Sequence, residues 1–147
     1  MPVSRSRPPV LVLDTHVWVW AVEGLVKHLG RSIVDAIEEA AHGGRLYVAA
    51  ISVWEVAMLV KKRRLILSRD VPSWIAAARR APGARVAPLT VPIAIDSADL
   101  PGLDTQDPAD RFIAATARAL SGHLVTCDGS LLAYGASGQL LTMDARR

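Results

Sequence analysis

Short apolar runs alternate with longer helical segments along this chain, and this alternation limits the possible folds more than any other feature. The run at residues 10–13 contains only valine and leucine, as expected of a buried parallel strand that is covered on both faces. The alternation favours an α/β three-layer sandwich with a mostly parallel central sheet flanked by helices. The expected strands are residues 10–13, 46–49, 85–87, 124–126 and 139–142.

Glycine, proline and capping residues separate the helical segments. Gly43 and Gly44 end the second segment, and Asp107 followed by Pro108 opens the sixth. Ser52 is placed to cap the third segment. The expected helices are residues 18–22, 32–41, 53–64, 71–80, 91–97, 108–120 and 130–134.

The chain of 147 residues suits a single domain, which we expect at residues 10–147 behind a basic, flexible tail at residues 1–9. The apolar run before Asp14 is far shorter than the roughly 20 residues of a transmembrane helix, so we expect neither a signal peptide nor a membrane span. Cys127 is the only cysteine, which excludes an internal disulfide and fits a reducing cytoplasm.

Four carboxylates lie where chain segments change direction. Asp14 and Asp128 each follow an apolar run, Glu55 lies in the third helical segment, and Asp110 lies at the opening of the sixth. Ligands bind outside the carboxyl ends of the strands in an open parallel sheet. Carboxylates that converge there would hold a hard divalent cation such as Mg²⁺. The four acids therefore predict metal-assisted hydrolysis.

Each acid also has a purely structural interpretation. Asp14 and Asp128 could cap the helices that follow them. Glu55 could pair with Arg111 or Lys62, but its neighbours are mostly apolar and a buried unpaired charge is costly. We favour a ligand role for Glu55, whereas Asp14 and Asp128 are ambiguous when taken singly.

The segment Asp107-Pro108-Ala109-Asp110 fits a helix start without any catalysis. Asp107 occupies the cap position, Pro108 the first helical position and Asp110 the third. A helix that points its N-terminus into the site would also turn Asp110 towards a cation. We interpret Asp107 as the cap and Asp110 as the ligand.

Four segments together resemble the successive motifs of PIN-domain ribonucleases, and most closely those of the VapC-type toxins of type II toxin–antitoxin pairs. The resemblance extends over roughly residues 10–142, with all motifs in the order of the family. The motifs are Leu13-Asp14-Thr15-His16, Ser52-Val53-Trp54-Glu55-Val56-Ala57, Asp107-Pro108-Ala109-Asp110-Arg111 and Val125-Thr126-Cys127-Asp128.

The resemblance implies an endoribonuclease that cleaves RNA with Mg²⁺ or Mn²⁺ held by Asp14, Glu55, Asp110 and Asp128. It also implies inhibition by a small cognate antitoxin protein, and a homodimer. Close relatives often carry a histidine in the loop before the Asp-Pro motif, where this chain has Thr105-Gln106. Any contribution of such a histidine is therefore absent.

Side chains around the four acids are expected to support them. Thr15 or Ser52 could hydrogen-bond a ligand or a metal-bound water, and Arg111 is expected to brace the acidic cluster. Thr126 is interpreted as a structural strand residue. The best candidate for contact with RNA phosphates is the basic run Lys61, Lys62, Arg63 and Arg64.

Two other functions remain open. A phosphatase of the haloacid-dehalogenase type also places an Asp at a strand end, but it usually needs a second acid two residues later, where this chain has His16. It also needs a late lysine, and no lysine follows Lys62. A non-catalytic RNA-binding or regulatory module would keep the fold without turnover, and it leaves Glu55 unexplained.

Overall fold

The computed structural model describes residues 7–147. Of the basic tail expected at residues 1–9, residues 1–6 lie outside the described part, and residues 7–9 are exposed and in no helix or strand.

Five strands form a single sheet in the order β3-β2-β1-β4-β5, and every neighbouring pair is parallel. Its centre is β1, where Leu13 lies opposite Val48 of β2 and Val125 of β4. The prediction of a mostly parallel sheet is confirmed. The strands are β1 (Leu11–Leu13), β2 (Leu46–Ala49), β3 (Arg85–Ala87), β4 (His123–Thr126) and β5 (Leu141–Asp144).

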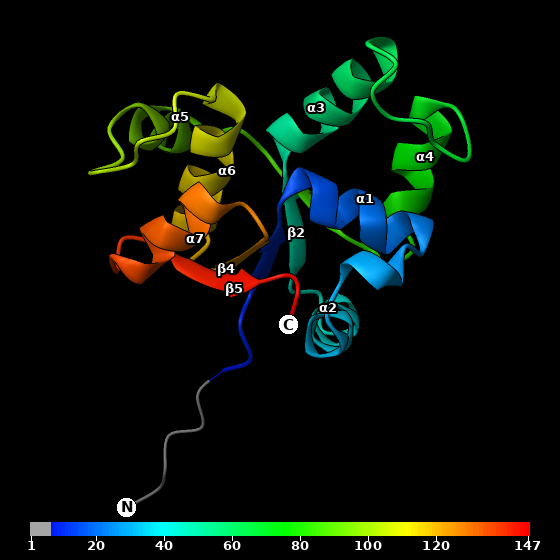
Figure 1. Cartoon of the computed structure of the whole chain (residues 1–147), viewed down its shortest axis with the longest axis horizontal. Helices are drawn as coiled ribbons and strands as arrows, with labels where there is room; N and C mark the ends of the chain where they lie inside the picture. Colours follow the sequence, from blue (N-terminus) through cyan, green and yellow to red (C-terminus); the bar gives the residue numbers. More distant parts are fainter. Residues whose placement is uncertain (1–6) are drawn as a thin grey trace, which may run out of the picture.

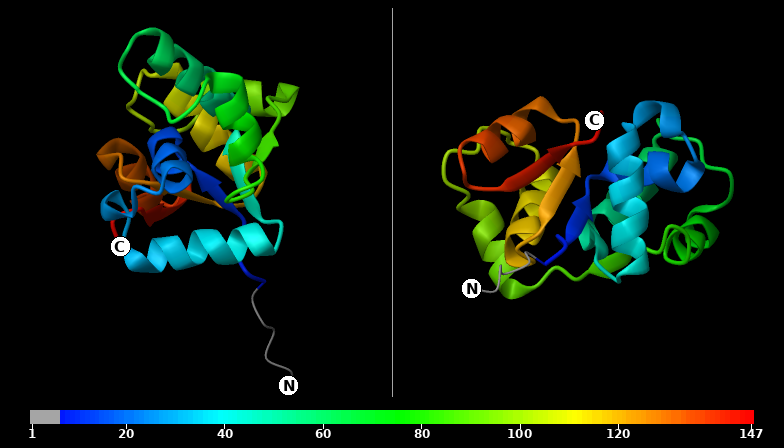
Figure 2. Two further views of the ribbon diagram at one scale, coloured as in Figure 1. Left: turned by 90° about the vertical axis from the view of Figure 1, so that its right-hand side faces the viewer. Right: turned by 90° about the horizontal axis from the view of Figure 1, so that it is seen from below.

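Helices cover both faces of the sheet, which gives the expected three layers. Helices α1 to α4 lie on one side, and α5 to α7 lie on the other (Figures 1 and 2). The helices are α1 (Thr15–Glu23), α2 (Arg31–His42), α3 (Ala50–Lys61), α4 (Val71–Ala78), α5 (Val91–Ala98), α6 (Pro108–Ala119) and α7 (Gly129–Ala136), with a short 3₁₀ helix at Val26–His28.

The central strand supplies both cores because successive strand side chains point to opposite faces. Leu11 and Leu13 pack in the core formed with α1 to α4, where Trp18 and Trp74 meet edge to face with ring centroids 5.0 Å apart. Val12 belongs to the second core, formed with α6 and α7. A strand buried on both faces explains why the run at residues 10–13 carries no polar residue.

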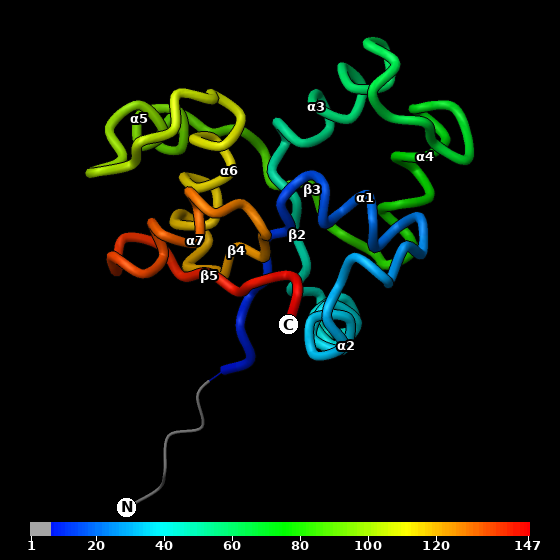
Figure 3. Tube along the Cα trace, viewed as in Figure 1, coloured from blue at the N-terminus to red at the C-terminus, as the bar shows by residue number. Residues whose placement is uncertain are grey.

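Two neighbouring strands pass into helices at their carboxyl ends with at most one residue between. The chain turns from β1 into α1 and from β2 into α3 at the same end of the sheet (Figure 3). Helix α3 begins at Ala50, so Ser52 lies inside its first turn and the prediction that Ser52 caps this helix was wrong. No helix within residues 7–147 is both long enough and apolar enough to cross a membrane.

Candidate functional site

Two of the four predicted acids lie just beyond the carboxyl ends of the neighbouring strands β1 and β4. Asp14 caps α1, since its Oδ1 accepts a 2.8 Å hydrogen bond from the Thr15 amide. Asp128 caps α7 by accepting a 3.0 Å bond from the Leu131 amide. The Thr126 hydroxyl links them, because it donates to Asp14 Oδ2 at 2.6 Å and accepts from the Asp128 amide at 3.0 Å. The capping interpretation is confirmed for both acids.

Glu55 faces this pair from the second turn of α3. The Thr15 hydroxyl lies 2.5 Å from Glu55 Oε1 and 2.9 Å from Ser52 Oγ, so it ties α3 to the start of α1. The alternative in which Glu55 pairs with Arg111 or Lys62 was wrong, because its hydrogen-bond partner is Thr15. Burial and the charges of nearby carboxylates raise the pKa of Glu55.

Asp110 lies in the first turn of α6, and of the four carboxylates it has the weakest hydrogen bonding. The Thr105 hydroxyl stands 3.4 Å from its Oδ2, which is long for a hydrogen bond between oxygens. Burial raises the pKa of Asp110 to about 7, and four neighbouring carboxylates add to the rise. Those carboxylates are, in decreasing order of effect, Asp107, Asp14, Asp128 and Glu55.

Asp107 has the capping role expected of it. Its Oδ1 accepts a 3.0 Å hydrogen bond from the Ala109 amide at the start of α6. Its charge also raises the pKa values of both Asp110 and Glu55 after the effect of burial. Asp107 is therefore a fifth member of the acidic cluster in electrostatic terms, which the sequence interpretation as a cap alone did not include.

Arg111 does not brace the carboxylates as expected. Its guanidinium donates to three backbone carbonyls, those of Ser97 at 3.2 Å, Leu103 at 3.2 Å and Thr105 at 3.0 Å. The side chain thus fixes the loop between α5 and α6, and it leaves the charges of the acids uncompensated. Proximity in sequence to Asp110 was misleading because adjacent helical residues point in different directions.

Among the described residues no lysine or arginine forms an ion pair with the acidic cluster, although the charge of His16 opposes the rise that burial causes in the pKa values of Asp14 and Glu55. The ion pairs of the described residues join Arg118 to Asp96 and Arg146 to Asp144, both away from the cluster. Within residues 7–147, no three histidine, cysteine or acidic side chains are gathered closely enough to hold a metal ion. Like charges repel one another, so carboxylates without a counter-ion stand apart. Carboxylate oxygens nevertheless form the donor set that a hard divalent cation takes.

The family model of the PIN domain matches residues 11–136. The chain belongs to the PIN-domain family. It is 36% identical over 125 residues to Ribonuclease VapC22 of Mycobacterium tuberculosis, and the match covers 84% of this chain and 91% of that protein.

Solved structures show the same fold at low sequence identity. VapBC2 from Rickettsia felis bound to a promoter DNA fragment contains a chain with a TM-score of 0.63 and 17% identity, covering 90% of this chain and 96% of that one. FitAcB from Neisseria gonorrhoeae contains one with a TM-score of 0.60 and 24% identity, covering 92% and 97%. The expected PIN-like architecture is confirmed.

The basic run lies at the opposite end of α3 from the acids. Lys61, Lys62, Arg63 and Arg64 are all exposed at and just beyond the end of this helix. With a rise of 1.5 Å per residue, Lys61 lies roughly 9 Å further along the helix axis than Glu55. A role for this run in RNA contact stays a prediction for this PIN domain.

Two threonines of this PIN domain were missed by sequence reasoning. Thr126 was interpreted as structural, but its buried hydroxyl joins the two strand-end acids. Thr105, in the loop where relatives often carry a histidine, lies beside Asp110 and also accepts from the Asp107 amide at 3.2 Å. The spacing Thr126-Cys127-Asp128 held a signal, because a hydroxyl two residues before an acid can bond the backbone amide of that acid.

Proposed function

We propose that this PIN domain is the toxin of a toxin–antitoxin pair, an endoribonuclease that hydrolyses RNA phosphodiester bonds with Mg²⁺ or Mn²⁺ held by Asp14, Glu55, Asp110 and Asp128. The observation that carries the proposal is the gathering of these carboxylates around Thr15 and Thr126 with no ion pair to lysine or arginine among residues 7–147, and burial together with this negative charge raises the pKa of Asp110 to about 7. Such an accumulation of negative charge is unfavourable unless a cation binds. The 36% identity to a protein named as a ribonuclease supports RNA as the substrate.

The residues of the chain suit this metal. When bound, a divalent cation would polarise the scissile phosphate and lower the pKa of an attacking water. Asp14 is held in place by Thr126 and the Thr15 amide, and Glu55 is oriented by the Thr15 hydroxyl. Asp110, half-protonated near pH 7, would release its proton as it becomes a ligand.

The deciding experiment is incubation of the purified protein with labelled total RNA in Mg²⁺ or Mn²⁺, and then with EDTA. We expect cleavage that EDTA stops. Asp35→Asn, which removes an exposed carboxylate on α2, is the control for the loss of one negative charge and should cleave normally. Cleavage that is indifferent to EDTA would refute the metal mechanism.

The other two functions lead to different results in the same assay. Turnover of a small phosphoester without RNA cleavage would favour the phosphatase, which membership of the PIN family already opposes. RNA that is bound and stays intact in the presence of either metal would favour the non-catalytic module. The proposed place of action is the cytoplasm, where RNA is available and Cys127 stays reduced.

A small antitoxin and a second copy of the chain are the proposed protein partners. The structures that share the fold include VapBC-5 from Mycobacterium tuberculosis, described as a member of a toxin–antitoxin family. Large apolar side chains that are exposed on α3 and around α5 support protein contacts. They are Trp54 (56% exposed), Leu89 (47%), Val91 (73%) and Ile95 (66%). Co-expression with the product of a neighbouring short reading frame, followed by light scattering, tests both partners.

A further inference from the structure

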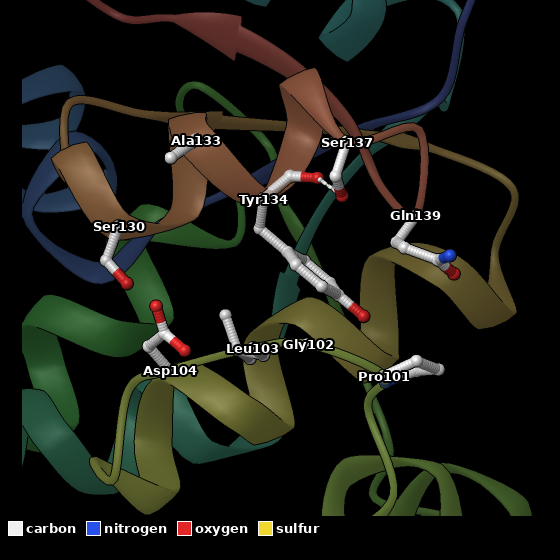
Figure 4. A pocket seen from close by; sticks show the side chains of 9 residues that line it. All are labelled: Pro101, Gly102, Leu103, Asp104, Ser130, Ala133, Tyr134, Ser137 and Gln139. Atoms are coloured by element: carbon white, nitrogen blue, oxygen red, sulfur yellow. Dashed lines mark hydrogen bonds between the residues drawn. The ribbon is translucent and has the colours of Figure 1, made fainter.

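A groove beside α7 adjoins the acidic cluster but takes no part in the proposed chemistry. It has a volume of about 530 Å³, within the range of small-ligand sites. Ser130 in its wall comes two residues after Asp128, and Asp104 in the opposite wall directly precedes Thr105 beside Asp110. The lining residues are Pro101, Gly102, Leu103, Asp104, Ser130, Ala133, Tyr134, Ser137 and Gln139 (Figure 4).

The lining is unsuited to a phosphate and suited to a flat, neutral heterocycle. None of the nine lining residues is lysine or arginine, and Asp104 would repel an anion. Pro101, Leu103 and the Tyr134 ring supply apolar surface, while serine hydroxyls and an amide supply hydrogen bonds. Unpaired RNA bases are recognised in this way, by apolar or stacking contacts together with hydrogen bonds to their edges.

Asp104 selects among the four bases. Its exposed carboxylate faces the Ser130 hydroxyl across the groove (Figure 4). An ionised carboxylate only accepts hydrogen bonds, and it can accept two side by side. Guanine offers two adjacent donors on its Watson–Crick edge, N1–H and the exocyclic amine. Adenine, cytosine and uracil each place an acceptor next to their donor, which would repel the second carboxylate oxygen.

Tyr134 closes the inner end of the groove. This residue is only 4% exposed, and its hydroxyl is buried without a hydrogen-bond partner within the described part of the chain. The hydroxyl points towards Pro101 and Gln139, away from Asp104 (Figure 4). It therefore has no surface open to a ligand, and the recognition of a base depends on Asp104.

We propose that the groove binds an unpaired guanine of the RNA substrate, with Asp104 accepting hydrogen bonds from N1–H and the exocyclic amine. The proposal rests on the proposed ribonuclease function and names the base that the site prefers near the cleaved bond. The position of the groove between Asp128 and the loop that carries Thr105 places this guanine next to the acidic cluster.

The first test measures binding apart from cleavage. Short labelled RNAs with one guanosine, or with inosine in its place, are titrated by fluorescence anisotropy with Ca²⁺ as the divalent ion, and their length is checked afterwards. Inosine lacks the exocyclic amine, so the wild type should bind it about tenfold to a hundredfold more weakly, the range for one hydrogen bond to a charged group. Asp104→Asn should lose this preference, whereas Asp99→Asn, an exposed acid outside the groove, should keep it.

Tyr134→Phe is a second control, because the hydroxyl that it removes is buried and has no partner. The free protein should melt at the same temperature or higher, and the variant should keep the preference for guanosine over inosine. Equal binding of guanosine and inosine by the wild type, or a preference that survives Asp104→Asn, would overturn the guanine site. EDTA-sensitive cleavage, measured separately, would still stand as the test of the ribonuclease function.

Discussion

The acids at the strand ends and the acids on the helices differ in how the protein supports them. Asp14 and Asp128 each accept hydrogen bonds from backbone amides and share the hydroxyl of Thr126. Glu55 has one hydroxyl partner, and Asp110 has one at the long distance of 3.4 Å. Asp14 and Asp128 therefore also cap helices, a role that needs no metal. Glu55 and Asp110 cap no helix and form no ion pair within residues 7–147.

This difference separates two kinds of carboxylate in the proposed metal site. The strand-end pair is positioned by the same bonds that begin α1 and α7, so its geometry follows from folding. Burial raises the pKa values of Glu55 and Asp110, and the surrounding negative charges add to the rise. Burial also raises the pKa of Asp14, but there the hydrogen bonds from Thr126 and Thr15 oppose the rise. A bound cation would relieve that repulsion, and Glu55 and Asp110 should respond most to its arrival.

The largest expected effect is on cleavage. Asp110→Asn should lower the rate of RNA cleavage by more than about 100-fold, because even residues that only support a metal ligand cost about 10–100-fold. Asp128→Asn keeps an oxygen that can cap α7, so its loss should be smaller, about tenfold. Single-turnover rates with Mg²⁺ measure both. Equal losses would remove the distinction between the two pairs, and an active Asp110→Asn would exclude Asp110 from the site.

The next effect is a pH dependence. The pKa of Asp110 rises from 3.8 to about 7 in the folded protein. At pH values between these two, the folded state therefore binds more protons than the unfolded state. Without metal, stability should therefore fall as the pH rises from about 4 to about 7. Thermal unfolding in EDTA across this range measures it, with Asp110→Asn as the variant that should show a shallower fall. Mg²⁺ affinity should rise over the upper part of the same range.

A smaller effect is expected on stability, which two substitutions in the acidic cluster should change in opposite directions. Asp128→Ala removes an N-cap and should lower the free energy of unfolding by about 1 kcal/mol. Glu55→Gln removes a charge from the uncompensated cluster and should raise the stability of the metal-free protein. Urea unfolding in EDTA measures both variants. Destabilisation by Glu55→Gln would mean that its bond to Thr15 outweighs the repulsion.

The last comparison concerns two threonines, each of which accepts a hydrogen bond from the amide of an acid two residues later. Thr126→Val removes a buried hydroxyl that bonds both strand-end acids, and it should cost about 1–2 kcal/mol of stability. Thr105→Val removes only longer contacts, of 3.2 Å and 3.4 Å, and should cost less than about 0.5 kcal/mol. Urea unfolding at one pH is sufficient. Equal costs would indicate that Asp110 is supported as firmly as Asp14.

Much of the fold followed from local patterns. The strands at residues 46–49 and 85–87 have the expected bounds, because a buried apolar run specifies β2 and Pro88 directly follows β3 at the edge of the sheet. Helix α1 begins at Thr15 rather than at residue 18, since Asp14 caps it directly after the strand. Helix α3 begins at Ala50 without a side-chain cap, so its start left no signal of this kind in the sequence.

The partners of the site were less predictable than its acids. Arg111 follows Asp110 in the sequence, yet its guanidinium turns to carbonyls at Ser97, Leu103 and Thr105. The direction of a long side chain depends on which backbone groups the loop presents to it. The loop conformation depends in turn on packing between α5 and α6, which no local pattern encodes.

The sequence by itself determined the three-layer fold and the places of three acids, Asp14 and Asp128 after strands and Asp110 at a helix start, because periodicity and capping are local properties. Only the tertiary structure decided how the four acids are supported. Thr126 reaches Asp14 across 112 positions of sequence, and Thr15 reaches Glu55 across 40. Hydrogen bonds and charge repulsion depend on distances in space, and the parallel pairing of β1 with β2 and β4 sets those distances.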